Sequence, residues 1–182
     1  YNGVDESNSN VLTLDGVERV NTVDTSGESY IYADSALGQA YLSGNEGYTR
    51  LEVNGENSWD LGNVNLSVSG GNGYDSILVD AWEGSVTANL NLVDTTGSES
   101  SLNAHEGSHG VTATVTGGSG YDVVNVHGGE SNTLNLANVE KVDAGDSWYG
   151  NTITADAALE TAILGDGGDT LTVTGLYTII DT

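Results

Sequence analysis

Short runs of alternating apolar and polar residues recur along the whole chain, separated by glycine-rich and acidic segments. Val64-Asn-Leu-Ser-Val68 and Val111-Thr-Ala-Thr-Val115 are typical. Successive side chains of a strand point to opposite faces, so these runs predict strands with Val, Leu, Ile and Ala inside and Thr, Ser and Asn outside. The best helix candidate, residues 155–163, aligns with residues 33–41 and is predicted to be a corner followed by a strand.

The sequence also repeats itself at long spacing. Three pairs of segments match: Ser69-Gly-Gly-Asn-Gly-Tyr-Asp75 with Thr116-Gly-Gly-Ser-Gly-Tyr-Asp122, Ala81-Trp-Glu-Gly-Ser85 with Ala104-His-Glu-Gly-Ser108, and Gly16-Val-Glu-Arg-Val20 with Asn138-Val-Glu-Lys-Val142. Internal repeats of 20 to 50 residues are typical of solenoids, in which each repeat stacks on the next.

Aligning the repeats predicts rungs that each open on one short strand. The predicted opening strands are Ile31–Ala33, Leu51–Val53, Leu78–Val79, Leu102–Ala104, Val124–Val126, Ile153–Ala155 and Leu171–Val173. The steps between them average about 23 residues, a length typical of solenoids. We therefore expect an all-β parallel solenoid, a β-helix or β-roll, right-handed by analogy with the crossover rule. It would be a single domain over residues 1–182, with partial rungs at 1–30 and 171–182.

Composition narrows the function classes. The chain has 27 acidic and 3 basic residues, a formal net charge of −24. Such a surface repels nucleic acid and attracts cations. There is no cysteine and hence no disulfide. A secreted chain without disulfides is commonly stabilised by a bound metal instead, so we expect a secreted, metal-stabilised protein. No apolar run approaches the ~18 residues of a membrane span.

Carboxylates concentrate in the glycine-rich corners. The acidic residues at these corners are Asp75, Asp94, Asp122, Asp143, Asp146, Asp166 and Asp169. A solenoid that stacks all of these corners on one edge would bring their charges together, and Ca²⁺ would relieve the repulsion because it accepts six to eight oxygen ligands in flexible geometry. We therefore expect Ca²⁺ at this edge.

Two of the corners carry a recognisable motif. Gly70-Gly-Asn-Gly-Tyr-Asp-Ser-Ile-Leu78 and Gly117-Gly-Ser-Gly-Tyr-Asp-Val-Val-Asn125 resemble the RTX nonapeptide G-G-x-G-x-D-x-U-x. The resemblance implies a calcium-loaded β-roll in an exported bacterial protein, as in toxins, proteases, adhesins and surface-layer proteins. By this resemblance the calcium ligands would be the carboxylates of Asp75 and Asp122 and the carbonyls of Gly71, Gly73, Gly118 and Gly120.

The chain departs from that family in its spacing. RTX motifs follow one another every nine residues, whereas these two lie 47 residues apart, on alternate rungs. The resemblance is closer to the long-rung solenoids of surface-layer proteins and large adhesins than to a toxin's β-roll. The alternative interpretation is that Gly-x-Asp corners are simply good turns.

Other motifs are explained by the repeat. His105-Glu-Gly-Ser-His109 matches the zinc-protease signature H-E-x-x-H, which requires a helix, but it aligns with the corner at Trp82. The Thr-x-Thr runs at 112–116, 152–154 and 170–174 resemble those of ice-binding solenoids. Rungs at 31 and 51 lack the pair, so these threonines are interpreted as outward strand residues.

The leading functional expectation is an extracellular structural module of a surface layer, a filament or an adhesin stalk. The sequence ends in an uncharged, β-prone stretch at residues 171–180 and begins with another partial rung. These two ends predict head-to-tail self-association, or continuation of the solenoid in a longer chain. Trp59, Trp82, Trp148 and nine tyrosines, mostly at corners, leave a glycan-binding adhesin open. Their simpler role is to cap the ends of the core with an apolar ring whose polar edge stays in water. A carbohydrate-active β-helix enzyme is the third alternative, although no catalytic constellation is visible and no enzyme activity is expected.

Overall fold

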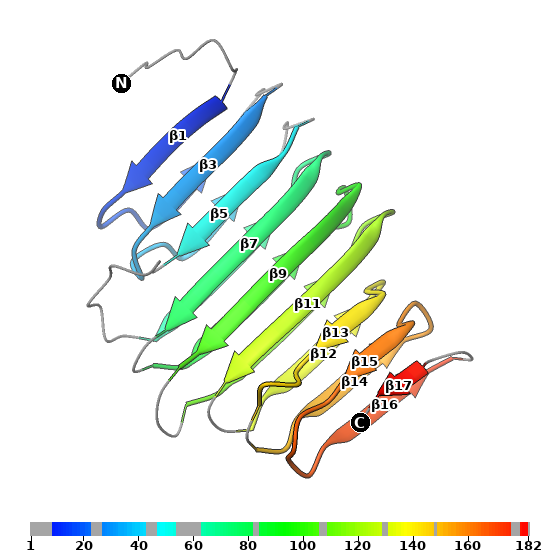
Figure 1. Ribbon diagram of the computed structural model, residues 1–182. Coiled ribbons are helices and arrows are strands. Elements are labelled where there is room, and N and C mark those ends of the chain that lie inside the picture. The colour runs from blue at the N-terminus through cyan, green and yellow to red at the C-terminus, as the bar shows by residue number, and fades with distance from the viewer. Residues whose placement is uncertain are drawn as a thin grey trace.

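The computed structural model describes residues 9–22, 27–42, 47–53, 63–81, 84–105, 109–128, 131–147, 149–175 and 179–181. These residues form seventeen strands in two parallel sheets, one of nine strands and one of eight (Figure 1). The architecture is an all-β solenoid with rungs of about 22 residues, which confirms the predicted fold class. Among the described residues there is no helix of the length and apolarity needed to cross a lipid bilayer.

The odd-numbered strands make the nine-stranded sheet. They are β1 (Ser9–Leu14), β3 (Glu28–Ala33), β5 (Thr49–Val53), β7 (Tyr74–Ala81), β9 (Gly97–Ala104), β11 (Tyr121–Gly128), β13 (Lys141–Asp143), β15 (Thr161–Ile163) and β17 (Ile179–Asp181). The even-numbered strands make the eight-stranded sheet. They are β2 (Arg19–Asn21), β4 (Gln39–Tyr41), β6 (Val64–Ser69), β8 (Val86–Asn91), β10 (Val111–Thr116), β12 (Thr133–Ala137), β14 (Thr152–Asp156) and β16 (Thr170–Thr174). Within each sheet, every described strand pairs with the corresponding strand of the next rung.

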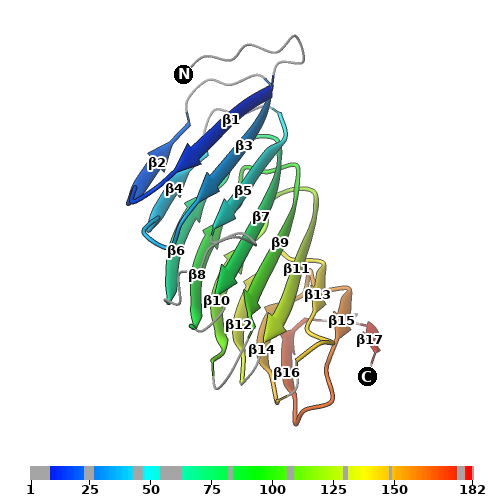
Figure 2. The same cartoon turned by 60° about the vertical axis from the view of Figure 1, so that its left-hand side comes forward.

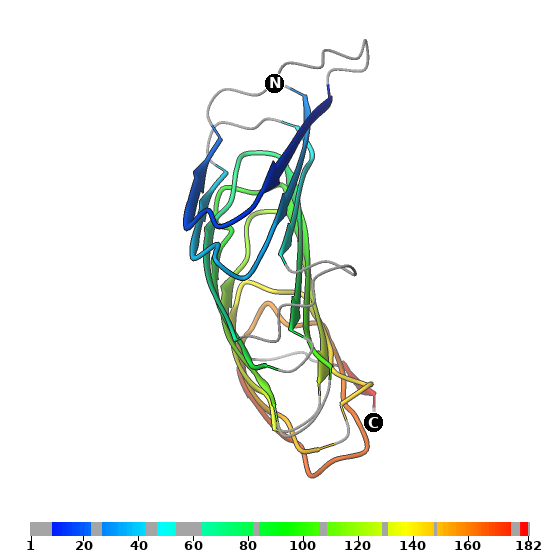
Figure 3. The same cartoon turned by 90° about the vertical axis from the view of Figure 1, so that its left-hand side faces the viewer.

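The two sheets face each other (Figures 2 and 3), and the buried side chains between them form one apolar cluster. In β8 and β10 exposed and buried residues alternate without interruption, as the sequence pattern predicts. Leu51 and Ile77 from one sheet and Leu90 and Leu134 from the other are almost fully buried. Burial of each such side chain contributes about 1.5–3 kcal/mol, so the stacked apolar columns are the main source of stability.

The chain turns at two edges. At the first edge it passes from the eight-stranded to the nine-stranded sheet, as at residues 70–73 and 117–120. At the second edge it passes back, as at residues 34–38. The central repeats stack as predicted: Ala81 is in register with Ala104, and Val86 with Val111.

The predicted opening strands at 153 and 171 are wrong. Both segments belong to the eight-stranded sheet, in β14 and β16, whereas the openers at 31 to 124 belong to the nine-stranded sheet. The nine-stranded sheet continues instead through β13 and β15, where a single inward side chain, Val142 or Ala162, gives too short a pattern to detect. In β7 the partner of Leu51 is Ile77 rather than Leu78.

The third repeat pair is alike locally but does not stack. Asp34 and Asp156 each accept two backbone N–H bonds: from Gly16 and Ala36, and from Asn138 and Ala158, respectively. The cross-rung donors Gly16 and Asn138 share a left-handed backbone, with φ of 65° and 53°. The corner at Asp34 leads from β3 to β4 at the second edge, whereas the corner at Asp156 leads from β14 to β15 at the first edge. The two halves of a rung can therefore be built from one local pattern.

Candidate functional site

A column of buried polar side chains runs along the first edge, inside the start of the nine-stranded sheet. The backbone register places its members in consecutive rungs, and all are buried: Ser29, Thr49, Asp75, Ser98 and Asp122. These positions point inward, where alternation would normally place apolar residues. We call this set the polar column. It contains both aspartates of the RTX-like motifs, two rungs apart with Ser98 between them.

Both side-chain oxygens of Asp122 are hydrogen-bonded, one within its own corner and one to the neighbouring rung. Its Oδ2 accepts the backbone N–H of Gly118 at 2.8 Å, and its Oδ1 accepts the hydroxyl of Ser98 at 2.6 Å. Its own N–H donates to Glu140 Oε2 at 2.7 Å. The hydrogen bond from Gly118 to Asp122, four residues later, therefore closes the turn. Charge-assisted hydrogen bonds of this kind fix a buried carboxylate firmly in position.

The glycines of this corner allow neighbouring corners to approach closely. A Cβ on Gly118 would collide with the backbone carbonyls of Leu92 and Thr95, and one on Gly120 would collide with the backbone of Thr96. Because the obstacle is backbone, a side chain could be accommodated only by moving a rung. The motif glycines are explained by rung packing as well as by turn geometry.

Asp75 is less well satisfied than Asp122. Its Oδ2 accepts the N–H of Gly71 at 2.9 Å, and the side chain of Thr49 also hydrogen-bonds to it. Its Oδ1 is buried and has no hydrogen-bond partner among the described residues. Burial raises the pKa of Asp75 to about 6, against the opposing effect of the two hydrogen bonds. A buried carboxylate with a free oxygen is costly when ionised, so Asp75 is a chemically unusual position in the fold.

The described geometry of the motif corners does not fit the calcium site that the resemblance implies. Asp75 and Asp122 point at N–H donors of their own corners, and they are two rungs, or about 10 Å, apart. The carbonyl of Gly73 accepts the N–H of Thr96 at 2.9 Å, and that of Gly118 accepts the side-chain amide of Asn138. In the part of the chain that the structure describes, no three His, Cys, Asp or Glu residues are grouped to hold a metal ion.

The expectation that all acidic corners share one edge is wrong. Asp94 is exposed on the first edge with the motif aspartates. The remaining corner acids lie on the second edge, because the strands that follow them belong to the eight-stranded sheet; they are Asp143, Asp146, Asp166 and Asp169. The predicted ladder of carboxylates is thereby divided between opposite sides of the solenoid.

The second edge has its own buried polar column, made mainly of amides. Asn132 accepts the N–H of Val111 at 2.8 Å and donates to Asn151 Oδ1 at 2.8 Å. Asn151 in turn donates its backbone and side-chain N–H groups to Asp169 Oδ1 at 2.6 and 2.8 Å. Both asparagines are buried. Asparagine at a turn has no distinctive sequence pattern, so these two positions were not predicted. Their signal was the recurrence of Asn before Thr at 132 and 151.

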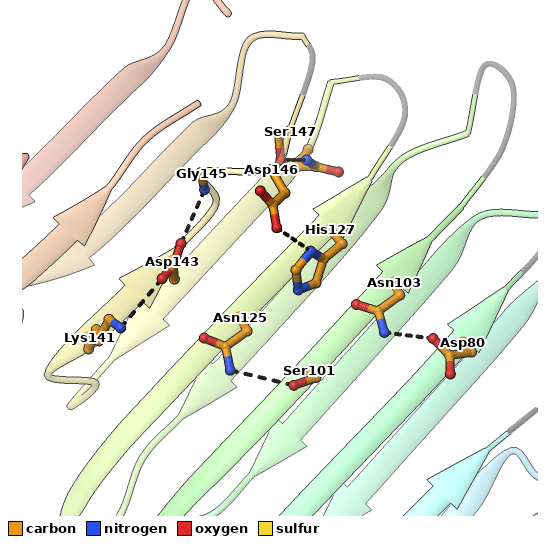
Figure 4. A network of polar contacts seen from close by, with 11 residues as sticks. Asp80, Ser101, Asn103, Asn125, His127, Lys141, Asp143, Gly145, Asp146 and Ser147 are labelled. Atoms are coloured by element: carbon orange, nitrogen blue, oxygen red, sulfur yellow. Dashed lines mark hydrogen bonds and ion pairs between the residues drawn. The ribbon is translucent and has the colours of Figure 1, made fainter. Parts of the chain in front are cut away.

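Histidine and acidic side chains meet on the outer face of the nine-stranded sheet (Figure 4). Asp80 Oδ1 lies 2.6 Å from Asn103 Nδ2 and 3.0 Å from His105 Nε2. Separately, His127 Nδ1 lies 3.0 Å from Asp146 Oδ2. The two histidines therefore contact different carboxylates. His127 and Asp146 are both exposed, so the ion pair between them adds little to the stability of the fold.

The H-E-x-x-H segment spans the connection between β9 and β10. His105 directly follows β9, His109 lies just before β10, and residues 106–108 are outside the described residues, as are Trp59, Trp82 and Trp148. Comparison with known proteins gives no match to a protein family, to a curated protein or to a solved structure.

Proposed function

We propose that this chain is a structural solenoid module of an extracellular assembly, such as a surface layer, a filament or an adhesin stalk. The observation that carries the proposal is the exposure of the inward side of β1, the first strand of the stack among the described residues. Leu12 pairs with Ile31 and so points into the interior, yet it is 41% exposed, whereas Ile31 is 2% exposed. An interior that is open at its end can be covered by a further rung, from another copy or from the same chain.

The other end offers a comparable surface. Leu171 and Val173 of β16 pack on the core but remain partly exposed. Two ends with such exposed inward side chains would join head to tail between molecules, and because this contact is not closed by symmetry it would build a filament. The extracellular location is supported by the acidic, cysteine-free composition and by the RTX-like corners. The proposal assigns no catalytic role.

A pair of matched variants tests end-to-end assembly. Leu12→Glu places a charge in the open interior, while Val11→Glu adds the same charge to the same strand on its outer side, where Val11 is 67% exposed. We expect the unmodified chain to form end-to-end oligomers in sedimentation velocity and electron microscopy. Leu12→Glu should remain monomeric, because burying an unpaired charge is costly, and Val11→Glu should still assemble.

The same measurements can refute end-to-end assembly. If the unmodified chain stays monomeric at high concentration, self-assembly through these ends is refuted. If Leu12→Glu and Val11→Glu assemble equally well, the open interior at β1 is not the contact. Repeating the measurement with chelator and with Ca²⁺ tests whether assembly of this strongly acidic chain requires a cation.

Glycan binding is a second candidate, favoured by a stack of tyrosines on the outer face of the nine-stranded sheet. The rings of Tyr30 and Tyr48 have centroids 6.0 Å apart, and those of Tyr48 and Tyr74 are stacked with centroids 6.0 Å apart. Tyr74 is 39% exposed, so part of this aromatic surface is available to a ligand. Loss of binding to a glycan array in Tyr74→Ala, with binding retained in Tyr149→Ala, would support it.

A further inference from the structure

The outer face of the eight-stranded sheet carries a regular two-column array from β6 to β16. The array consists of Asn65, Ser67, Thr87, Asn89, Thr112, Thr114, Thr133, Asn135, Thr152, Thr154, Thr170 and Thr172, which we call the threonine face. All twelve side chains are exposed, and eight of them are threonine. Strands β6 to β16 follow one another along one side of the solenoid in Figure 2.

The threonine face is periodic in two directions. Every strand of the array is paired in parallel and in register, so that Thr87, Thr112, Thr133, Thr152 and Thr170 form one column. Neighbours in a column are ~4.8 Å apart, and the two columns are ~6.6 Å apart, because alternate residues of a strand share a face. Threonine is stiff about its first side-chain torsion, so its hydroxyl and methyl groups hold this spacing at a small entropic cost.

The face is also uncharged in a chain of net charge −24. None of its twelve residues is acidic or basic. The equivalent outward positions of the nine-stranded sheet include Arg50, Glu52, Glu99, Lys141 and Asp143. Both outer faces have the same backbone geometry, so the difference lies in the choice of side chains. An acidic protein that keeps these two ordered columns neutral presents there a surface suited to a neutral, ordered partner.

We propose that the threonine face binds the surface of ice. Ice is a neutral, periodic array of hydrogen-bonding groups, and a rigid array of hydroxyls and methyls can be matched by ordered water at low entropic cost. Residues 31 and 51, whose rungs lack a Thr-x-Thr pair at these positions, lie in β3 and β5 of the nine-stranded sheet, on the other face. Within the eight-stranded sheet the polar pair recurs in every strand from β6 to β16.

Two other occupants fit the face less well. A protein partner requires about 800 Å² on each side of a stable interface, whereas a two-column array of six strands covers on the order of 400 Å². A crystalline polysaccharide would be expected to stack its sugar rings on aromatic side chains, and none of the twelve residues is aromatic. The inference does not depend on the proposed structural role, since a chain that fails to assemble could still bind ice.

The test uses two tyrosine variants. Thr114→Tyr places a bulky side chain near the centre of the threonine face, and Thr161→Tyr makes the same change on β15, whose outer face belongs to the other sheet. Tyrosine is uncharged and well tolerated in strands, so both variants should fold; circular dichroism checks this. Ice-crystal shape and the gap between melting and freezing temperatures are measured in a nanolitre osmometer for all three proteins.

We expect the unmodified chain and Thr161→Tyr to facet growing ice crystals and to open a measurable gap, and Thr114→Tyr to lose most of it. Unshaped crystals and no gap with the folded, unmodified chain would overturn the proposal, as would equal loss in both variants. Binding to microcrystalline cellulose that depends on Thr114, without any effect on ice, would replace ice by a polysaccharide. A dimer that Thr114→Tyr dissociates, again without an effect on ice, would replace it by a second copy of the chain.

Discussion

Replacement of Asp75 by asparagine provides a quantitative test of the polar column. Burial raises the pKa of Asp75 from its ordinary value of 3.8 to about 6 in the folded protein. Each pH unit between these two values corresponds to about 1.4 kcal/mol, so the ionised carboxylate costs the folded state about 3 kcal/mol above pH 6. The asparagine side chain of the Asp75→Asn variant would carry no charge, while its oxygen could still accept the N–H of Gly71.

The sign of the pH dependence follows from the raised pKa. The folded state holds the proton of Asp75 more tightly than the unfolded state, so this group contributes stability below about pH 4 and loses it as the pH rises to about 6. The free energy of unfolding of Asp75→Asn relative to the unmodified chain should therefore increase by about 3 kcal/mol between pH 3.5 and pH 7.5. Urea unfolding followed by circular dichroism measures this difference at each pH. Asp94→Asn removes an equal charge at an exposed corner of the same edge and should show little change.

A difference that does not vary with pH would refute the assignment of Asp75 as a destabilising buried carboxylate. The calcium site implied by the RTX resemblance predicts the opposite sign, because a bound cation favours the ionised carboxylate. In that case Ca²⁺ would stabilise the unmodified chain at pH 7.5, and Asp75→Asn would abolish the effect. The same titration in chelator and in millimolar Ca²⁺ therefore distinguishes the two roles of Asp75.

Two further substitutions test the packing at the edges, both measured by urea unfolding. Gly118→Ala should destabilise the protein by about 2 kcal/mol or more, because its Cβ would meet the backbone of the adjacent rung. Gly168→Ala is the control. No atom of a neighbouring segment lies within 4 Å of its added carbon, so it should change stability by less than about 0.5 kcal/mol. Asn132→Ala should lower the free energy of unfolding by about 3 kcal/mol, because it leaves the N–H of Val111 and the side-chain carbonyl of Asn151 without a partner. Asn135→Ala, at an exposed position, should be nearly neutral. Equal effects of the two substitutions would contradict the role of the buried asparagines at the second edge.

The internal repeats were enough to predict the solenoid and its rung length, and its strands were predicted from the alternation of apolar and polar residues. It was reliable in strands such as β8 and β10, where three inward residues establish the period. It failed at β13 and β15, where each strand contributes one inward residue and the corners resemble those of the opposite edge. The error displaced two later strands into the wrong sheet and hid the continuity of the threonine face.

The corner chemistry was predicted less well than the fold. The motif correctly identified Asp75 and Asp122 as equivalent positions on alternate rungs, because the Gly–Asp spacing closes the same turn in both. Sequence could not tell whether these carboxylates point outward to a cation or inward to backbone N–H groups, since that depends on which rung lies alongside. The buried partners Thr49 and Ser98 come from other rungs, and only the register of the stacked strands brings them together.

The likeness between the two halves of a rung constrains how such a gene can change length. Adding or deleting a whole rung of about 22 residues leaves every later strand in its own sheet. Adding half a rung would exchange the sheets for everything downstream, because the corner at Asp34 and the corner at Asp156 follow the same local rules at opposite edges. The hydrophobic alternation would be preserved, and the chain could still close a core. The neutral threonine columns, however, would be interrupted by acidic residues at the point of insertion. Selection for that surface would therefore permit insertions and deletions of whole rungs only.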